Sequence, residues 1–243
     1  MSLARRLSRL AIIPTGLILL VQAKRLRRDT PLLPDAAQPW TGDVSGDDPQ
    51  SLLVLGDSTA AGVGAPTQDE ALPGNLARAL SVRTSRGIRW RALGENGATA
   101  RDIVERYLDE ATDTSYDFVF LTIGANDALG IRSRRAFTKD IRTILERLRA
   151  ASPEAAILVS SLPAFTRFEL LPNPLRWNLY LHSMSLEDAA RSVVARMPGV
   201  HMSPPPPPYT EGFFATDLFH PSASGYRDWA RFAVDDAVTA GIL

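Results

Sequence analysis

Hydrophobic positions from residue 51 onward follow two alternating patterns. Short runs rich in apolar residues, typical of strands buried on both faces of a sheet, are separated by stretches in which apolar residues recur every three or four positions. The short runs predict five strands, at Leu52–Leu55, Ile88–Leu93, Asp117–Ile123, Ala155–Ser161 and Val200–Met202. The stretches with helical spacing predict helices at 70–82, after a cap at Thr99, and at 134–150, 175–197 and 221–240.

Strands and helices therefore alternate along most of the chain. A helix between two strands is the usual crossover between parallel neighbours, and such helices cover both faces of the sheet. We predict an α/β fold with a parallel sheet between two layers of helices.

The first 28 residues do not fit this pattern. Fourteen uncharged and mostly apolar residues, 10–23, lie between arginines on one side and the basic group 24–28 on the other. A helix of that length measures about 21 Å, which is shorter than the ~30 Å hydrocarbon layer of a bilayer. Pro14 and Gly16 weaken such a helix further. We interpret residues 1–28 as a basic and apolar membrane-addressing segment rather than as a membrane span.

Three interpretations of this segment stay open. An apolar run after arginines, with small residues near Ala23, is typical of a cleaved signal peptide. Lys24 and the arginines after it resist translocation, which favours an uncleaved or interfacial anchor. A cytosolic extension is the third interpretation. We expect membrane association or export through this segment, and a cytoplasmic location is not excluded.

The next boundary is marked by a change in composition. Residues 29–50 are rich in Pro, Gly and Asp without periodicity and are predicted to be a linker. A single folded domain is then predicted to span 51–243. Within it, the five prolines Pro204–Pro208 predict a stiff polyproline II spacer.

Composition narrows the classes of function. The 243 residues are 45% hydrophobic and 22% charged, which is typical of a folded protein. A net charge of zero argues against a general nucleic-acid binder. The absence of cysteine excludes disulfides, thiol nucleophiles and thiolate metal sites. Three histidines without paired acidic ligands, and glycines at 62 and 64 without a following Lys-Ser/Thr, predict neither a metal nor a nucleotide cofactor.

Polar residues follow the predicted strands at their carboxyl ends, where open parallel sheets bind ligands. The four sequence blocks in question are Gly56-Asp57-Ser58, Gly94-Glu95-Asn96-Gly97, Gly124-Ala125-Asn126-Asp127 and, before the last helix, Asp217-Leu218-Phe219-His220. We expect these blocks to meet in one pocket.

Together the blocks supply the parts that acyl transfer to a serine needs. Ser58 is the candidate nucleophile, His220 the base that accepts its proton, and Asp217 the group that orients the imidazole. Backbone N–H groups of Ser58 and Gly97 and the side-chain amide of Asn126 can donate to the oxyanion.

The same blocks, in this order, resemble those of the SGNH, or GDSL-type, serine hydrolases. The resemblance spans about 51 to 240. It implies a three-layer α/β/α, flavodoxin-like fold with a five-stranded parallel sheet. It also implies cofactor-free hydrolysis of carboxylic esters, including lipid esters, or thioesters through an acyl-enzyme. By the resemblance Ser58, Asp217 and His220 form the triad, and Ser58, Gly97 and Asn126 form the oxyanion hole.

Other functions fit the same residues. An acyltransferase or a sugar deacetylase would use the same site, and a non-catalytic lipid- or carbohydrate-binding module would keep only the fold. Thr59 stands where the common lipolytic form has Leu, which bears on the substrate rather than on the chemistry. Asp127 is predicted to be a structural hydrogen-bonding residue. The aromatic residues Phe213, Phe214 and Phe219 either line an acyl pocket or simply pack.

Overall fold

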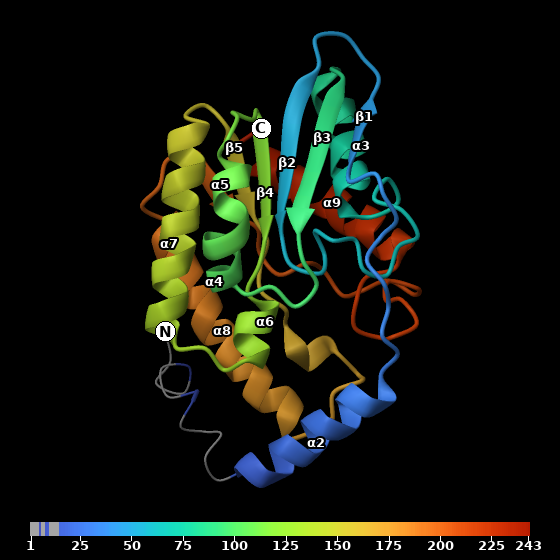
Figure 1. Ribbon diagram of the computed structural model, residues 1–243, viewed down its shortest axis with the longest axis vertical. Helices are drawn as coiled ribbons and strands as arrows, with labels where there is room; N and C mark the ends of the chain where they lie inside the picture. Colours follow the sequence, from blue (N-terminus) through green and yellow to red (C-terminus); the bar gives the residue numbers. More distant parts are fainter. Residues whose placement is uncertain (1–4, 6–7, 10–14) are drawn as a thin grey trace.

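The structure, a computed structural model, describes Arg5, Ser8, Arg9 and residues 15–243. Its centre is a six-stranded sheet in the order β1-β3-β2-β4-β5-β6 (Figure 1). The strands are β1 (Thr41–Val44), β2 (Gln50–Gly56), β3 (Ile88–Gly94), β4 (Phe118–Thr122), β5 (Ala156–Val159) and β6 (Val200–Met202). All neighbouring strands except β1 and β3 pair in parallel. The predicted α/β fold is confirmed, with six strands in place of five.

The additional strand, β1, lies within 29–50, the range expected to be a linker. Its sequence, Thr-Gly-Asp-Val, has no apolar run, and its side chains alternate between exposed and half-buried. It pairs antiparallel with β3, in the register Thr41↔Arg91 and Val44↔Ile88. Backbone hydrogen bonds to an open sheet edge, rather than burial of side chains, therefore define this strand, which is why hydrophobic patterning did not predict it.

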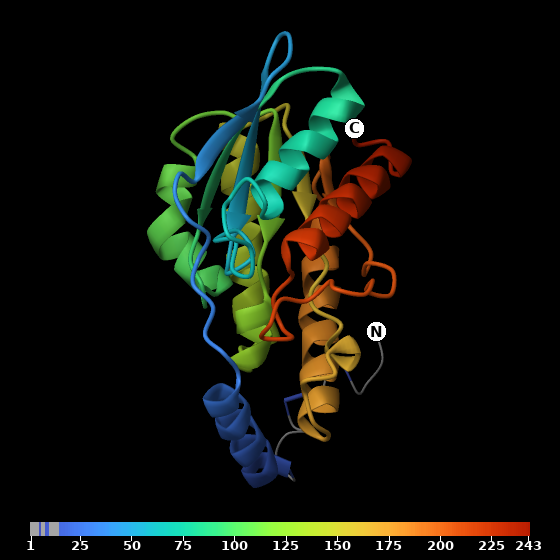
Figure 2. The same cartoon turned by 90° about the vertical axis from the view of Figure 1, so that its right-hand side faces the viewer.

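Alternate residues of β2 point into two separate cores. Leu53 and Leu55 belong to the core on one face of the sheet, and Leu52 and Val54 to the core on the other. The first core is covered by α7 (Arg134–Ala151) and α8 (Leu175–Val194), and the second by α3 (Leu72–Thr84) and α9 (Ala223–Thr239). Figures 1 and 2 show the two helix layers on opposite sides of the sheet.

Shorter elements complete the layers. Thr99 begins one helical stretch with a capping box, in which its side chain accepts from the N–H of Asp102 and the Asp102 carboxylate accepts from the N–H of Thr99. This stretch consists of α4 (Ala100–Asp102), a π-helical turn (Ile103–Tyr107) and α5 (Leu108–Ala111). Two further elements, α6 (Ala125–Leu129) and a 3₁₀ turn (Phe165–Arg167), follow β4 and β5.

Helix α2 (Gly16–Asp29) is the described part of the N-terminal segment. It lies against the beginning of α8, at the end of the molecule toward which the carboxyl ends of the parallel strands point (Figures 1 and 2). None of the described helices is both long enough and apolar enough to cross a membrane. Most of the predicted run 10–23 is contained in α2, but residues 10–14 lie outside the described residues.

Candidate active site

Ser58 lies in a tight turn directly after strand β2, at the carboxyl end of the sheet. Gly56 is required in this turn, because a Cβ there would lie 1.9 Å from the carbonyl oxygen of Thr122 in β4. The N–H of Asp57 donates to that same oxygen at 3.1 Å. The chain then leaves the sheet, and Ser58 presents its hydroxyl at the edge of a pocket.

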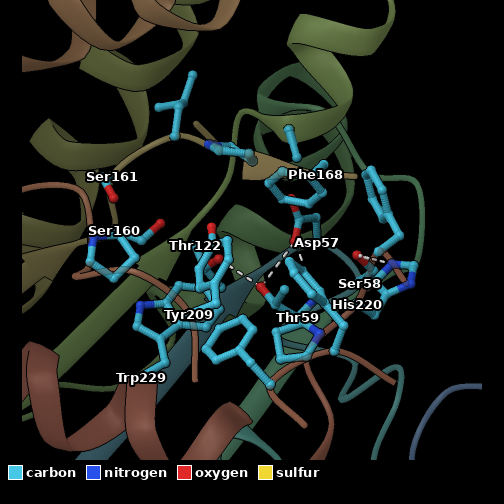
Figure 3. Close-up of a pocket in the computed structure, with 18 of the residues that line it drawn as sticks. Asp57, Ser58, Thr59, Thr122, Ser160, Ser161, Phe168, Tyr209, His220 and Trp229 are labelled. Carbon is cyan, nitrogen blue, oxygen red and sulfur yellow. Dashed lines mark hydrogen bonds between the residues drawn. The ribbon is translucent and has the colours of Figure 1, made fainter. Parts of the chain in front are cut away.

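Ser58, His220 and Asp217 form one chain of hydrogen bonds. His220 Nε2 lies 3.0 Å from Ser58 Oγ, as drawn in Figure 3, and His220 Nδ1 lies 2.5 Å from Asp217 Oδ2. A carboxylate at Nδ1 keeps the proton of the neutral ring on that nitrogen, so Nε2 is left to accept from the serine hydroxyl. The structure thus brings together the three residues predicted to form the triad.

The spacing of three between Asp217 and His220 has a local structural basis. Asp217 Oδ1 accepts from the backbone N–H groups of Phe219 and His220, both at 3.0 Å, while Oδ2 faces the ring. Leu218, between them, takes a left-handed conformation with φ of 55°. One carboxylate therefore closes the turn and orients the imidazole.

The charge of Asp217 is set by the same contacts. Burial alone would raise the pKa of this carboxyl, but the hydrogen bonds from His220 and from the two backbone N–H groups outweigh it. The pKa of Asp217 therefore lies below its ordinary value. At neutral pH the carboxylate is ionised and can stabilise a positive charge on the ring.

The residues expected to form the oxyanion hole lie on three adjoining segments. Among the described residues, no protein acceptor takes the backbone N–H of Ser58 or of Gly97. Gly97 has a φ of +88°, a conformation that favours glycine. The Asn126 side chain donates one amide hydrogen to the carbonyl of Ala98 at 3.0 Å, which leaves its second hydrogen for another acceptor.

These segments are joined by hydrogen bonds next to the site. The N–H of Glu95 donates to the carbonyl of Gly56 at 3.3 Å, which places the turn containing Gly97 beside the turn containing Ser58. Asp127 accepts from the N–H of Ala100 at 2.9 Å and from Arg132 at 2.7 Å. Asp127 is fully buried and has the contacts of a structural residue.

A pocket of about 90 Å³ opens beside Ser58 and His220. Part of its wall is aromatic and comes from the residue after the 3₁₀ turn, the segment after the prolines, the loop of His220 and α9: Phe168, Tyr209, Phe213, Phe214, Phe219 and Trp229. The Phe168 ring is central, with its centroid 5.2 Å from that of Phe214 and 5.4 Å from that of Phe219. Gly97, Asn126 and Asp217 do not line this pocket.

The contacts of the Thr59 hydroxyl were not predicted from the sequence. Its hydroxyl donates to Asp57 at 3.1 Å and lies 2.6 Å from the hydroxyl of Thr122 (Figure 3). A leucine at this position could not make either bond. Burial raises the pKa of Asp57 to about 6, although the hydrogen bonds from Thr59 and the charge of His220 oppose the shift. The only sequence signal was the unusual Thr after the serine.

The other two histidines do not line the pocket. His182 is buried between the Ser8 hydroxyl and the carbonyl of Arg132, each at 3.0 Å. His201 contacts Asp236 at 2.6 Å. Within the described ranges, no group of three His, Asp or Glu side chains is arranged to hold a metal ion.

Comparisons with known proteins agree with this architecture. The sequence profile of the "GDSL-like Lipase/Acylhydrolase family" matches residues 54–227, which is more than half of the chain. The "GDSL-like esterase Rv1075c" of Mycobacterium tuberculosis (strain ATCC 25618 / H37Rv) is 28% identical over 218 residues, a match that covers 83% of this chain and 66% of that relative. The chain therefore spans slightly less than two thirds of this curated relative.

Solved structures show the same fold. LAE5, an alpha/beta hydrolase enzyme from the metagenome of Lake Arreo, Spain, has a TM-score of 0.59 at 17% identity, covering 82% of this chain and 98% of LAE5. Phospholipase A1 from Streptomyces albidoflavus NA297 has a TM-score of 0.56 at 18% identity, covering 77% and 99% of the respective chains. With its profile match, its sequence blocks and this fold, the chain belongs to the GDSL-like lipase/acylhydrolase family, as the resemblance to SGNH hydrolases predicted.

Proposed function

We propose that this protein hydrolyses carboxylic esters through an acyl-enzyme formed on Ser58. The observation that carries the proposal is the continuous hydrogen-bond chain from Ser58 through His220 to Asp217 at the edge of an apolar pocket. Membership of the lipase/acylhydrolase family and the curated name of the esterase relative support ester hydrolysis as the reaction class.

Acylation begins when Ser58 Oγ attacks the ester carbonyl carbon and its proton moves to His220 Nε2. The electron pair of the carbonyl π bond moves to the oxygen. When the tetrahedral intermediate collapses, the bond to the alcohol oxygen breaks, and the alcohol leaves with the proton from Nε2. Asp217 stabilises the imidazolium through the Nδ1 hydrogen bond while the ring carries this proton.

Deacylation repeats the sequence with water. Water gives a proton to His220 Nε2 as its oxygen bonds to the acyl carbon, and the proton then returns to Ser58 Oγ as the acid leaves. In both steps, we propose that the oxyanion is stabilised by the N–H groups of Ser58 and Gly97 and by the second amide hydrogen of Asn126. The absence of a protein acceptor for the two backbone groups, among the described residues, supports this assignment.

The pocket favours esters with short acyl chains. The room beside Ser58 is limited, with a cavity volume of about 90 Å³. Aromatic side chains that pack on one another, with Phe168 at their centre, close the wall. We propose that an acyl group of a few carbons occupies this space and that Phe168 limits its length.

The test is hydrolysis of 4-nitrophenyl esters of increasing acyl length by the wild-type protein and by Ser58→Ala and Phe168→Ala variants. Ser58→Ala is expected to lose activity by roughly 10⁴-fold or more, since the nucleophile is removed. Wild-type activity should decrease from butyrate to octanoate, and Phe168→Ala should move the preference to longer chains. Ser192→Ala, which removes a hydroxyl on the exposed side of α8, is the matched control.

Four outcomes would contradict the proposal or favour an alternative to it. A Ser58→Ala variant as active as wild type would exclude an acyl-enzyme on this serine, whereas wild-type activity that is absent on every ester, like that of the variant, would favour a non-catalytic binding module. Loss of the ester without release of free acid, in the presence of an added alcohol or sugar, would identify an acyltransferase. Activity confined to O-acetylated sugars would instead favour the deacetylase alternative. Membrane contact and export through residues 1–28 stay predictions.

A further inference from the structure

Helix α2 has one face on the protein and an opposite face that none of the described residues covers. On the inner face, Leu19 is buried against α8. The Gln22 side chain fixes the helix with two hydrogen bonds. Its amide nitrogen donates to the carbonyl of Asn173 at 2.7 Å, and its amide oxygen accepts from the N–H of Leu175 at 3.2 Å. The helix therefore has a defined orientation, and its outer side chains form a defined surface.

The outer face of α2 is strongly apolar in its first half. Four of the nine large hydrophobic residues that are exposed in the described chain lie there, with exposed fractions between 50% and 82%: Leu17, Ile18, Leu20 and Val21. Trp177, which is 53% exposed, lies two residues beyond the point where Gln22 contacts α8. Exposed apolar groups concentrated in this way mark an interaction site.

The second half of the same helix is basic. It contains Lys24, Arg25, Arg27 and Arg28 against one acid, Asp29. Arg28 is paired with Asp29 at 2.7 Å, whereas the other three cations make no ion pair in the described part of the chain. Leu17, Lys24 and Arg28 follow one another on the outer stripe of the helix at spacings of seven and four residues.

We propose that α2 docks this protein on the surface of an anionic lipid bilayer. An apolar helix face continued by unpaired basic groups is complementary to acyl chains on one side of the interface and to phosphate headgroups on the other. The helix does not cross the bilayer. Leu17, Leu20 and Val21 enter the interface, and Lys24, Arg25 and Arg27 lie at the headgroups.

Docking through α2 also sets the orientation of the site. Helix α2 lies at the end of the molecule where the carboxyl ends of the parallel strands lie, as both ribbon views show. The chain leaving α2 reaches the site, because the N–H of Ala36 donates to the carbonyl of Ala61 at 3.0 Å, three residues after Ser58. The docked protein would therefore turn its pocket end toward the lipid. The docking itself does not depend on the proposed ester hydrolysis.

Sedimentation with lipid vesicles tests the proposal on the full chain. We expect binding to vesicles of phosphatidylcholine mixed with phosphatidylglycerol, much weaker binding to phosphatidylcholine alone, and a decrease with added salt. The Lys24→Glu/Arg25→Glu/Arg27→Glu variant should lose roughly 100-fold or more in affinity, since three charges contribute a factor of about five each. The Leu17→Ser/Leu20→Ser/Val21→Ser variant should also lose binding.

The matched control is Arg83→Glu/Arg142→Glu/Arg231→Glu, which makes the same change in net charge at exposed positions of α3, α7 and α9. It should bind vesicles within a few-fold of wild type. Thermal unfolding verifies that each variant is folded, and hydrolysis of a soluble ester is measured separately, so that failure of docking and failure of the proposed function are distinguished.

Three results would overturn the proposal. One is wild-type binding by the α2 charge variant. Another is an equal loss with the control variant, which would show that only net charge matters. The third is a dimer in light scattering that the Leu17→Ser/Leu20→Ser/Val21→Ser variant dissociates while vesicle binding is unchanged, because the apolar face would then belong to a second copy of the chain.

Discussion

Asn126 carries two amide hydrogens with different expected uses. One is donated to the carbonyl of Ala98 and fixes the side chain, while the other is assigned here to the oxyanion. In the proposed mechanism this second hydrogen is donated mainly in the transition state, so Asn126→Ala should decrease kcat by roughly 10² to 10³ with a smaller change in KM. Asn96→Ala, an exposed amide in the neighbouring turn, is the control in steady-state kinetics. Wild-type turnover by Asn126→Ala would remove this residue from the oxyanion hole.

The protonation of Asp57, next to Ser58, makes the stability of the folded protein depend on pH. Its pKa in the folded protein, about 6, exceeds the ordinary value of 3.8. The native state therefore holds this proton more tightly than the unfolded chain, and the Asp57 contribution to stability decreases as pH rises from about 4 to about 6.

We accordingly expect Asp57→Asn to gain stability relative to wild type as the pH is raised. The gain between pH 4 and pH 7 should be on the order of 2–3 kcal/mol, since one pKa unit corresponds to about 1.4 kcal/mol. Urea unfolding of both proteins at the two pH values measures the difference. If the two proteins differ in unfolding free energy by the same amount at both pH values, Asp57 has an ordinary pKa.

At the scale of elements, the loop after Ser58 packs directly on the loop that carries His220. Gly64 has a φ of +98°, and a Cβ there would lie 2.3 Å from the carbonyl oxygen of Pro221. The Tyr226 hydroxyl of α9 donates to the carbonyl of Val63 at 2.7 Å, which fixes the same contact. The distance between the serine and the histidine thus depends on backbone packing between two loops.

Gly64→Ala should consequently disturb catalysis as well as folding. The methyl group strains the left-handed backbone, at about 1–2 kcal/mol, and pushes on the residue next to His220. We expect kcat to decrease by a larger factor than the loss of folded protein explains. Steady-state kinetics and thermal unfolding of the same samples measure the two effects. Gly16→Ala, where no atom lies within 4 Å of the new Cβ, is the control. An unchanged kcat would show that the loop relaxes without moving the histidine.

Two ion pairs of Arg132 and a hydrogen bond of Asp127 join three helical elements near the site. Arg132 bridges Asp127 of α6 and Asp140 of α7, both at 2.7 Å, while Asp127 also accepts from the first N–H of α4. Asp127→Ala removes one of the two carboxylates that Arg132 contacts and leaves the Ala100 N–H without its acceptor, which should cost about 1–3 kcal/mol of unfolding free energy. Asp109→Ala, which breaks the exposed pair with Arg147, should cost no more than about 1 kcal/mol in the same urea titration. Equal losses would contradict the structural role of Asp127.

At the scale of the whole molecule, the buried strands and their connecting helices could be predicted from sequence. They bury apolar residues with a definite period, and three of the four blocks of the site follow directly at strand ends, while Asp217–His220 precedes the last helix. Strand β1 could not be predicted in this way, because it buries few side chains. For the aromatic wall, the sequence left open whether Phe213, Phe214 and Phe219 line a pocket or simply pack, because the wall is assembled from segments far apart in the chain. The catalytic roles of Ser58, Asp217 and His220 stay predictions, although their contacts agree with them.

Both edge strands of the sheet are short. Strand β1 has four residues, and β6 has three and is followed after one residue by five prolines, which lack the N–H that a ladder needs. A strand of another molecule could make only a few main-chain bonds with either edge strand. The short edge strands therefore disfavour edge-to-edge aggregation into fibrils, even though most residues of the inner strands are aliphatic or aromatic.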